Sequence, residues 1–266
     1  MPDRYAVIGN PVAHSKSPQI HAAFAQQTGE DIAYGRIEAP LEGFEAAVAA
    51  FRSGGGRGLN VTLPFKEQAF RIAAGVSPRA RAAEAVNTLR FTASGIEGDN
   101  TDGVGLVRDL QDNLGVPLAG LRLLIAGAGG AAQGVLLPLR EAGVVSIVVA
   151  NRTAARARAL AARFADVRGC GYSELAGESF DLVVNATSAG LAGEAPPLPK
   201  GLLVAGGLGY DMVYGRDTPF LAWARAAGAR TADGLGMLVE QAAESFFIWR
   251  GVRPDTAPVL RALRAG

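Results

Sequence analysis

The chain has 266 residues, of which 49% are hydrophobic and 19% charged, and its formal net charge is +1. This composition is typical of a folded protein with one large or two modest domains and excludes a disordered chain. The near-neutral charge, without a lysine-rich run, argues against nucleic acid or an anionic membrane as the main partner. The single cysteine excludes an intramolecular disulfide, and with only two histidines we expect no metal site.

No apolar run reaches the roughly 18 residues of a membrane helix, and the N-terminus lacks the layout of a signal peptide. We therefore expect a cytoplasmic protein. Glycine is the compositional outlier, with 35 of 266 residues, against a usual share of about 7%. Short apolar runs alternate with amphipathic stretches, and this pattern predicts an α/β protein with a mainly parallel sheet.

The first hundred residues begin with an expected strand at 5–9 and a helix at 17–29 that ends on a glycine. Pro18 favours the first helical turn, so Ser17 is the expected N-cap. The hydroxyls of Ser15 and Ser17 beside a helix N-terminus could equally bind a carboxylate. A second helix is expected over 44–55, and strands over 58–63 and 85–92, where β-branched residues are frequent.

One lysine in the segment GLNVTLPFKEQA is unusual for this chain. Lys66 is one of three lysines among 26 basic residues, so arginine is the habitual cation. Arginine stays protonated, whereas a lysine can give up or take a proton once it is partly buried. Lys66 is therefore either a solvated residue at the start of a helix or an acid–base group.

A second unit is expected from about Gly103 to about Asp233. Residues 121–153 read as a strand, a glycine turn, a helix and a second strand, the size of one βαβ unit. Two further buried strands are expected near 180–187 and 201–210. A long helix with bulky apolar residues is expected over 234–251.

The glycine turn GAGGAA matches the dinucleotide-binding fingerprint, with Gly127, Gly129 and Ala132 at its three small positions. The first glycine permits the tight turn, the second lets the backbone approach a pyrophosphate, and the small third residue lets the helix pack closely. The turn follows an apolar strand and opens a helix, which is the context that the fingerprint requires. We expect Gly127, Gly129, Gly130 and Ala131 to bind the cofactor.

The residues after the second strand favour NADP over NAD. An enzyme that selects NAD usually carries an acidic residue there. This chain has Asn151, Arg152 and Thr153, with Arg156 one turn later. A guanidinium suits the 2′-phosphate of NADP, although the same segment could be a helix with a basic, solvated face.

Several motifs together resemble one family. They are GNPVAHSKSPQIH, GLNVTLPFK, AVNTL, GDNTDG, GAGGAA, NRT, NATSAG, YDMVY and DGLGMLVEQAAESFFIWRG. They occur in the order found in shikimate dehydrogenases, and the resemblance spans about residue 6 to about residue 251.

The resemblance implies an enzyme that reduces 3-dehydroshikimate with NADPH, in the pathway to aromatic amino acids. It implies an N-terminal α/β substrate domain, residues 1–102 completed by helices within 234–266, and a Rossmann-type NADP-binding domain, residues 103–233, with a cleft between them. Lys66 matches the family's catalytic lysine and Asp102 the aspartate paired with it. The positions that match substrate-binding residues are Ser15, Ser17, Thr62, Asn87, Tyr214 and Gln241.

Four further residues are expected near the cofactor. Asn185, Thr187 and Ser188 follow a buried strand, and ligands bind at the carboxyl ends of strands in open α/β sheets. Met237 is expected either near the nicotinamide or in the core. The partners that we expect are the small-molecule substrate and NADP, in a monomer or a homodimer.

Alternative functions remain open at this point. Relatives in the family also oxidise quinate, accept NAD or process aminoshikimate, and a sensor that binds shikimate-like ligands without turnover would need similar binding residues. The short-chain dehydrogenases are excluded, because none of the five tyrosines is followed four residues later by lysine.

Overall fold

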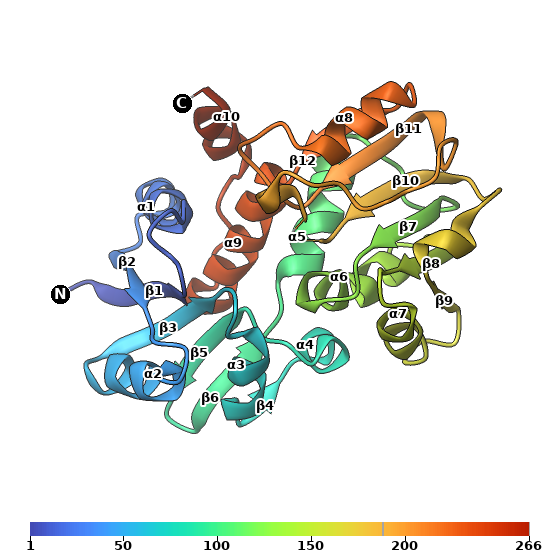
Figure 1. Ribbon diagram of the computed structural model, residues 1–266. Helices are drawn as coiled ribbons and strands as arrows, with labels where there is room; N and C mark the ends of the chain where they lie inside the picture. The colour runs from blue at the N-terminus through green and yellow to red at the C-terminus, as the bar shows by residue number, and fades with distance from the viewer. Residues whose placement is uncertain (188, 266) are drawn as a thin grey trace. The chain divides into compact units, whose positions relative to one another are not determined.

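The computed structural model describes residues 1–187 and 189–265, and its contacts divide the chain into two compact units (Figure 1). Unit 1 comprises Met1–Gly105 and Leu238–Gly266, and unit 2 comprises Leu106–Met237. Both boundaries fall inside helices, a few residues after the expected positions at Gly103 and Asp233. The roles of the two units as substrate and cofactor domains stay predictions.

Unit 1 contains a six-stranded mixed sheet in the order β2-β1-β3-β5-β6-β4. Strands β1, β2 and β3 pair in parallel, whereas β5 pairs antiparallel with both β3 and β6. The elements in chain order are β1 (Asp3–Gly9), α1 (Ser17–Thr28), β2 (Ile32–Glu38), α2 (Phe44–Ser53), β3 (Gly56–Val61), α3 (Lys66–Ile72), β4 (Gly75–Val76), α4 (Pro78–Ala83), β5 (Thr88–Thr92), β6 (Gly95–Asp99), α5 (Asp102–Arg108), α9 (Leu235–Arg250) and α10 (Ala257–Ala265).

Helices cover both faces of this sheet (Figure 1). On one face α2, α3 and α4 bury a cluster with the strands, in which Phe44 and Phe65 stack with centroids 4.9 Å apart. On the other face α1 and α9 bring aromatic rings against β1 and β2, and Tyr5 stacks on Trp249 at 4.5 Å. Burial of these rings, worth roughly 1.5–3 kcal/mol each, fixes both helices on the sheet.

A buried histidine of α1 lies in the aromatic layer between this helix and the sheet. The ring of His21 is fully buried and stacks on Tyr34, with centroids 4.2 Å apart and an interplanar angle of 7°. Neither ring nitrogen has a hydrogen-bond partner among the described residues. Burial disfavours the charged imidazolium and lowers the pKa of His21 to about 3.

This histidine predicts a loss of stability in mild acid. Between about pH 6.5, the ordinary pKa, and pH 3, the unfolded chain binds a proton at His21 that the folded chain does not, so stability falls as the pH falls through that window. From pH 7 to pH 5 the wild type should lose about 2 kcal/mol of unfolding free energy that His21→Phe does not lose. Urea unfolding at both pH values measures this difference, with the exposed His14→Phe as control. Equal acid losses in the wild type and His21→Phe would contradict the assignment.

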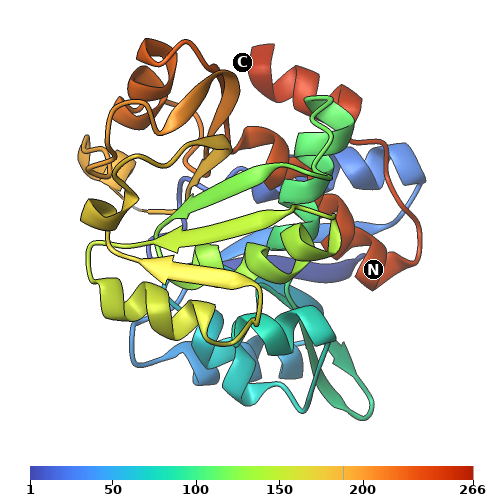
Figure 2. The same cartoon turned by 90° about the vertical axis from the view of Figure 1, so that its right-hand side faces the viewer.

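Unit 2 contains a six-stranded parallel sheet in the order β12-β11-β10-β7-β8-β9. In Figure 2 the strands β7, β8 and β9 run side by side in green to yellow. The elements are a π-helical turn (Asp109–Asn113), β7 (Arg122–Ala126), α6 (Gly130–Glu141), β8 (Ser146–Ala150), α7 (Ala154–Ala161), β9 (Val167–Cys170), a 3₁₀ turn (Tyr172–Leu175), β10 (Phe180–Asn185), a 3₁₀ turn (Ala189–Ala192), β11 (Leu203–Asp211), α8 (Pro219–Ala226) and β12 (Arg230–Asp233). Numbered from β7, this order is that of the Rossmann dinucleotide-binding fold, with its switch point between β7 and β10.

Alternate residues of the unit 2 strands face two separate cores. Leu123 and Ile125 of β7 belong to the hydrophobic cluster that the sheet forms with α5, α6 and α7. Leu124 belongs to the cluster on the other face, which includes residues of α8. Burial on both faces explains why these strands read as unbroken apolar runs. The predicted α/β class with a Rossmann-type second domain is confirmed.

Three features differ from the sequence-based expectation. The sheet of unit 1 is mixed, because the chain returns through the β5–β6 hairpin. Helix α1 begins at Ser17 itself, with Lys16 as the N-cap and no capping side chain, so the expected cap at Ser17 was wrong. The strand expected over 85–92 begins only at Thr88. None of the described helices is long and apolar enough to cross a membrane.

Candidate active site

The structure brings Lys66 and Asp102 together in unit 1. The ammonium Nζ of Lys66, at the start of α3, lies 2.6 Å from Oδ2 of Asp102, the first residue of α5. Their side chains are 19% and 9% exposed. The pair is therefore sheltered from solvent on the aspartate side but still open to a ligand on the lysine side. The sequence could not show this contact, because 36 residues separate the two.

Buried neighbours fix the backbone of Lys66. Phe65 is fully buried against Phe44, and the N–H of Val86 donates to the Lys66 carbonyl at 2.9 Å. The preceding turn is held by the N–H of Thr62, which donates to the Ile8 carbonyl at 2.9 Å. Lys66 thus lies at the end of a segment that the core of unit 1 holds in place.

The GDNTDG motif holds Asp102 in a similar way. Asp99 accepts hydrogen bonds from Arg79, with Nε at 2.7 Å and Nη2 at 2.9 Å. Asn100 donates its amide to the Ala85 carbonyl at 3.0 Å and accepts the N–H of Asp102 at 3.2 Å. These hydrogen bonds anchor the motif to neighbouring segments of unit 1. The carboxylate of Asp102 takes no part in them and is left for other partners.

Asn87 lies directly behind Asp102. Its Nδ2 donates to Oδ1 of Asp102 at 2.8 Å, and its Oδ1 accepts the N–H of Thr101 at 2.8 Å. Gln241 of α9 approaches the same amide, with Oε1 3.4 Å from Nδ2. Since Asn87 is 2% exposed, its amide orients Asp102, and its predicted contact with substrate stays a prediction.

The two serines before α1 form a hydroxyl pair. Ser15 Oγ donates to Ser17 Oγ at 3.1 Å and accepts the N–H of Ser17 at 3.3 Å. Arg36 of β2 donates twice to the Ser15 carbonyl, from Nη2 at 2.6 Å and from Nε at 3.2 Å. Hydroxyls and a guanidinium gathered in this way suit an anionic group.

Thr62 approaches the end of β1. A Cβ on Gly9 would lie 2.4 Å from the methyl group of Thr62, so only glycine permits this approach. The side chain of Thr62 is half-buried. It remains available to a ligand.

In unit 2 the glycine turn lies at the switch point of the sheet. Gly127 has a φ of +117°, and a Cβ there would lie 3.0 Å from the carbonyl of Ala186. Cβ atoms on Gly129 and Gly130 would meet nothing within 4 Å. Packing within the protein therefore explains why residue 127 is a glycine, but it does not explain Gly129 and Gly130. These two leave room for a ligand to approach the backbone closely at the N-terminus of α6. A dinucleotide pyrophosphate fits this turn.

The arginines after β8 are available to a ligand. Arg152 and Arg156 are exposed and form no ion pair with the described residues. Arg158 on the same helix is bound to Glu174 at 2.9 Å. The side chain of Asn151 donates to the Thr153 carbonyl at 3.1 Å and thereby shapes the turn. Two exposed guanidinium groups at the end of β8 fit the 2′-phosphate of NADP.

The other predicted cofactor residues have mixed surroundings. Asn185 is fully buried, donates to Asp211 at 3.1 Å and accepts the Thr187 hydroxyl at 2.7 Å. Its amide is therefore engaged within the loop. Ser188 lies outside the described residues. Met237 packs against the unit 2 core.

Tyr214 belongs to unit 2, apart in the chain from the predicted substrate residues of unit 1. It is half-buried, and burial raises the pKa of its hydroxyl, so that the neutral, donating form is favoured. Its predicted substrate contact stays a prediction.

Four buried polar residues of the site were missed by the sequence analysis, namely Asn60, Thr88, Thr101 and Ser245. All four lie inside quoted motifs: Asn60 in GLNVTLPFK, Thr88 in AVNTL, Thr101 in GDNTDG and Ser245 in DGLGMLVEQAAESFFIWRG. Ser245 follows Gln241 by four residues, which places both on one face of α9. Their places inside the motifs, and the four-residue spacing of Gln241 and Ser245, were the signals in the sequence that could have identified them.

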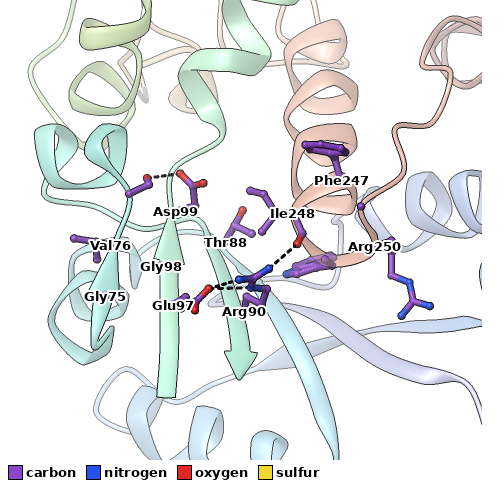
Figure 3. Close-up of a pocket in the computed structure, with 13 residues that line it drawn as sticks. Gly75, Val76, Thr88, Arg90, Glu97, Gly98, Asp99, Phe247, Ile248 and Arg250 are labelled. Carbon is purple, nitrogen blue, oxygen red and sulfur yellow. Dashed lines mark hydrogen bonds and ion pairs between the residues drawn. The ribbon is translucent and has the colours of Figure 1, made fainter. Parts of the chain in front are cut away.

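A hollow of about 830 Å³ opens elsewhere in unit 1, beside β5, β6 and the end of α9 (Figure 3). Its charged side chains already have partners: Arg90 pairs with Glu97 at 2.6 Å, and Asp99 with Arg79 at 2.7 Å. None of the predicted site residues that the structure describes lines it. It is therefore not the candidate active site. Within the described residues no group of three potential metal ligands is found.

The sequence matches three family profiles. Residues 7–89 match the shikimate dehydrogenase substrate binding domain, residues 109–192 match shikimate / quinate 5-dehydrogenase, and residues 234–264 match the shikimate 5′-dehydrogenase C-terminal domain.

Full-length relatives agree with these matches. A shikimate dehydrogenase (NADP(+)) from Methylobacillus flagellatus is 61% identical, and the alignment covers 99% of each chain. The crystal structure of an Ael1 enzyme from Pseudomonas putida is 51% identical, with a TM-score of 0.93 over 98% of each chain. Shikimate 5-dehydrogenase from Thermus thermophilus, in complex with NADP(H) and shikimate, is 39% identical, with a TM-score of 0.89 over 99% of each chain. The chain belongs to the shikimate dehydrogenase family.

Proposed function

We propose that this protein catalyses the reversible, NADPH-dependent reduction of 3-dehydroshikimate to shikimate, a step in the biosynthesis of aromatic amino acids. The observation that carries the proposal is the 2.6 Å contact between Lys66 Nζ and Asp102 Oδ2, which places a transferable proton next to a fixed carboxylate. Membership of the family and the full-length similarity to NADP(+)-dependent shikimate dehydrogenases support it.

The chemistry accounts for a lysine at this position. Bound NADPH supplies a hydride to the ketone carbon, and the ketone oxygen then becomes an alkoxide that needs a proton. Lys66 donates a proton from Nζ to this oxygen, and its positive charge stabilises the oxygen as its charge develops. The neutral amine regains a proton from solvent. Asp102 accepts a hydrogen bond from the ammonium and holds it in place.

Substrate selection would rest on the polar groups of unit 1. Ser15 and Ser17 would bind the carboxylate, with Arg36 holding the segment that carries them. Thr62, Asn87 and Gln241 would bind ring hydroxyls. Sites built to bond hydroxyls discriminate strongly against analogues that lack them, because buried polar groups are then left unpaired.

Cofactor binding would rest on unit 2. The backbone from Gly127 to Ala131 would hold the pyrophosphate at the N-terminus of α6, and Arg152 and Arg156 would bind the 2′-phosphate. Thr153 and Asn151 would support the adenosine end, with Asn185, Thr187, Ser188 and Met237 toward the nicotinamide end. Tyr214 stays a predicted substrate residue.

We propose action in the cytoplasm as a monomer or a homodimer, and the free, buried Cys170 fits a reducing compartment. A sensor without turnover is the main alternative. The Lys66–Asp102 pair favours an enzyme, because ligand binding alone does not need a proton donor.

The test is NADPH oxidation by the purified protein with 3-dehydroshikimate, followed by identification of the product. We expect stoichiometric formation of shikimate. Binding of shikimate and NADP by calorimetry, without any NADPH oxidation, would support the sensor instead.

A further inference from the structure

A buried hydrogen-bond network joins Tyr34 of β2 to the Lys66–Asp102 pair. Its members outside the predicted site are Asn60, Thr88, Thr101 and Ser245, and all four are at most 6% exposed. Thr88 lies on β5 beside α9, as Figure 3 shows. Ser245 comes from α9, 157 residues away from Thr88, and the two hydroxyl oxygens are 2.8 Å apart.

The direction of the hydrogen bonds is set at the Tyr34 end. The hydroxyl of Tyr34 donates to Oδ1 of Asn60 at 2.7 Å, because an amide oxygen can only accept. Nδ2 of Asn60 must therefore face the other way. It donates toward Ser245 Oγ at 2.9 Å and toward Thr88 Oγ1 at 3.2 Å.

The hydroxyl protons of Ser245 and Thr88 are consequently directed onward. The hydroxyl of Ser245 donates to Thr88 Oγ1 at 2.8 Å and shares that proton with the Gln241 carbonyl at 3.0 Å. Thr88 donates to Oδ1 of Asn87 at 2.9 Å. That oxygen also receives the N–H of Thr101, so both of its acceptor sites are filled by donors and Nδ2 of Asn87 faces Asp102.

We propose that Thr88 and Ser245 are positioning residues for the acid–base pair. Thr88, kept in place by Ser245, holds the Asn87 amide in the orientation that donates to Oδ1 of Asp102, and Oδ2 is thereby left to Lys66. The two hydroxyls act through Asn87 and touch neither substrate nor cofactor. The inference rests on the proposed reaction, since it concerns the proton donor of that reaction.

The experiment compares Thr88→Val and Ser245→Ala with the wild type in shikimate oxidation by NADP. Valine keeps the shape of threonine but cannot donate, so Oδ1 of Asn87 loses the Thr88 hydroxyl and keeps only the backbone N–H and the more distant hydroxyl of Thr101, at 2.8 and 3.2 Å. We expect kcat to fall about tenfold in Thr88→Val and about threefold in Ser245→Ala, with KM for shikimate changed less than about twofold. Thr88→Ser restores the hydroxyl and should restore most of kcat.

The matched control is Thr92→Val, the same substitution at the far end of β5, where the hydroxyl bonds only to Ser94 and the Gly95 carbonyl among the described residues. It should leave kcat and KM unchanged. Thermal unfolding of each variant separates a loss of folded protein from a loss of turnover.

Three outcomes would overturn the inference while the wild type is active. They are wild-type kcat in folded Thr88→Val, a rise in KM with kcat unchanged, and failure of Thr88→Ser to recover turnover. If the wild type itself oxidised no shikimate, the proposed function would fail first, and the inference would fail with it.

Discussion

Lys66→Ala should lower kcat for shikimate oxidation by about 10²–10⁴-fold, the usual contribution of a general acid or base. The side chain removed is the one that lies 2.6 Å from Asp102 and remains 19% exposed. KM should change much less, because shikimate would still bind through the serines and amides of unit 1. Steady-state rates with saturating NADP measure both constants.

One further variant separates the charge of Lys66 from its proton transfer, and another serves as the control. Lys66→Arg keeps a cation that can pair with Asp102 but does not release a proton, so its kcat should stay close to that of Lys66→Ala. The exposed Lys200→Ala removes a lysine of unit 2 and should behave as the wild type. Near-normal turnover in either Lys66 variant would end the assignment of Lys66 as the proton donor.

Arg152→Ala should raise KM for NADP about tenfold or more and leave KM for NAD nearly unchanged, because a hydrogen bond to a charged group is worth roughly 1.5–3 kcal/mol. Because Arg152 is exposed to solvent, its hydrogen bond to the 2′-phosphate should lie toward the lower end of that range. The guanidinium follows β8, is exposed, and forms no ion pair with the described residues, so it is available to bond the 2′-phosphate. Steady-state rates with each cofactor in turn measure the two constants.

The control for Arg152 lies on the neighbouring helix. Arg158→Ala removes a guanidinium that is already bound to Glu174 at 2.9 Å, and it should change neither constant. If Arg152→Ala raised KM for NAD and NADP by the same factor, the arginine would bind a part that both cofactors share, and the NADP assignment would be wrong.

Local patterns in the sequence predicted much of unit 2, because its central strands are buried on both faces and read as apolar runs. The glycine turn was predicted with its position between β7 and α6. Unit 1 was harder to predict. Its strand β2 carries exposed residues such as Arg36 and has no apolar run, and the antiparallel return through β6 lies in a glycine-containing stretch.

Lys66 was a candidate acid–base group because lysine is rare in this chain, Asp102 was named from the resemblance, and their contact came only from the fold. Lys66 and Asp102 open two different helices, and no local rule relates them. The hydroxyl network was less accessible still, since Asn60 and Ser245 are 185 residues apart and meet only where α9 packs on the sheet. The expected N-cap at Ser17 failed because Ser17 is already the first residue of the helix and Lys16 is its N-cap.

The most direct test of the proposed function is a two-by-two rate assay on the purified protein, with shikimate or quinate against NADP or NAD, followed by reduced-nicotinamide absorbance. We predict fast turnover with shikimate and NADP, a kcat/KM at least about tenfold lower with NAD, as the loss of one charged hydrogen bond implies, and slower turnover with quinate. Comparable rates with quinate or NAD would contradict the specificity assigned to unit 1 or to Arg152. No turnover in any combination, with both ligands bound, would contradict the assignment of Lys66 and Asp102 as a catalytic pair.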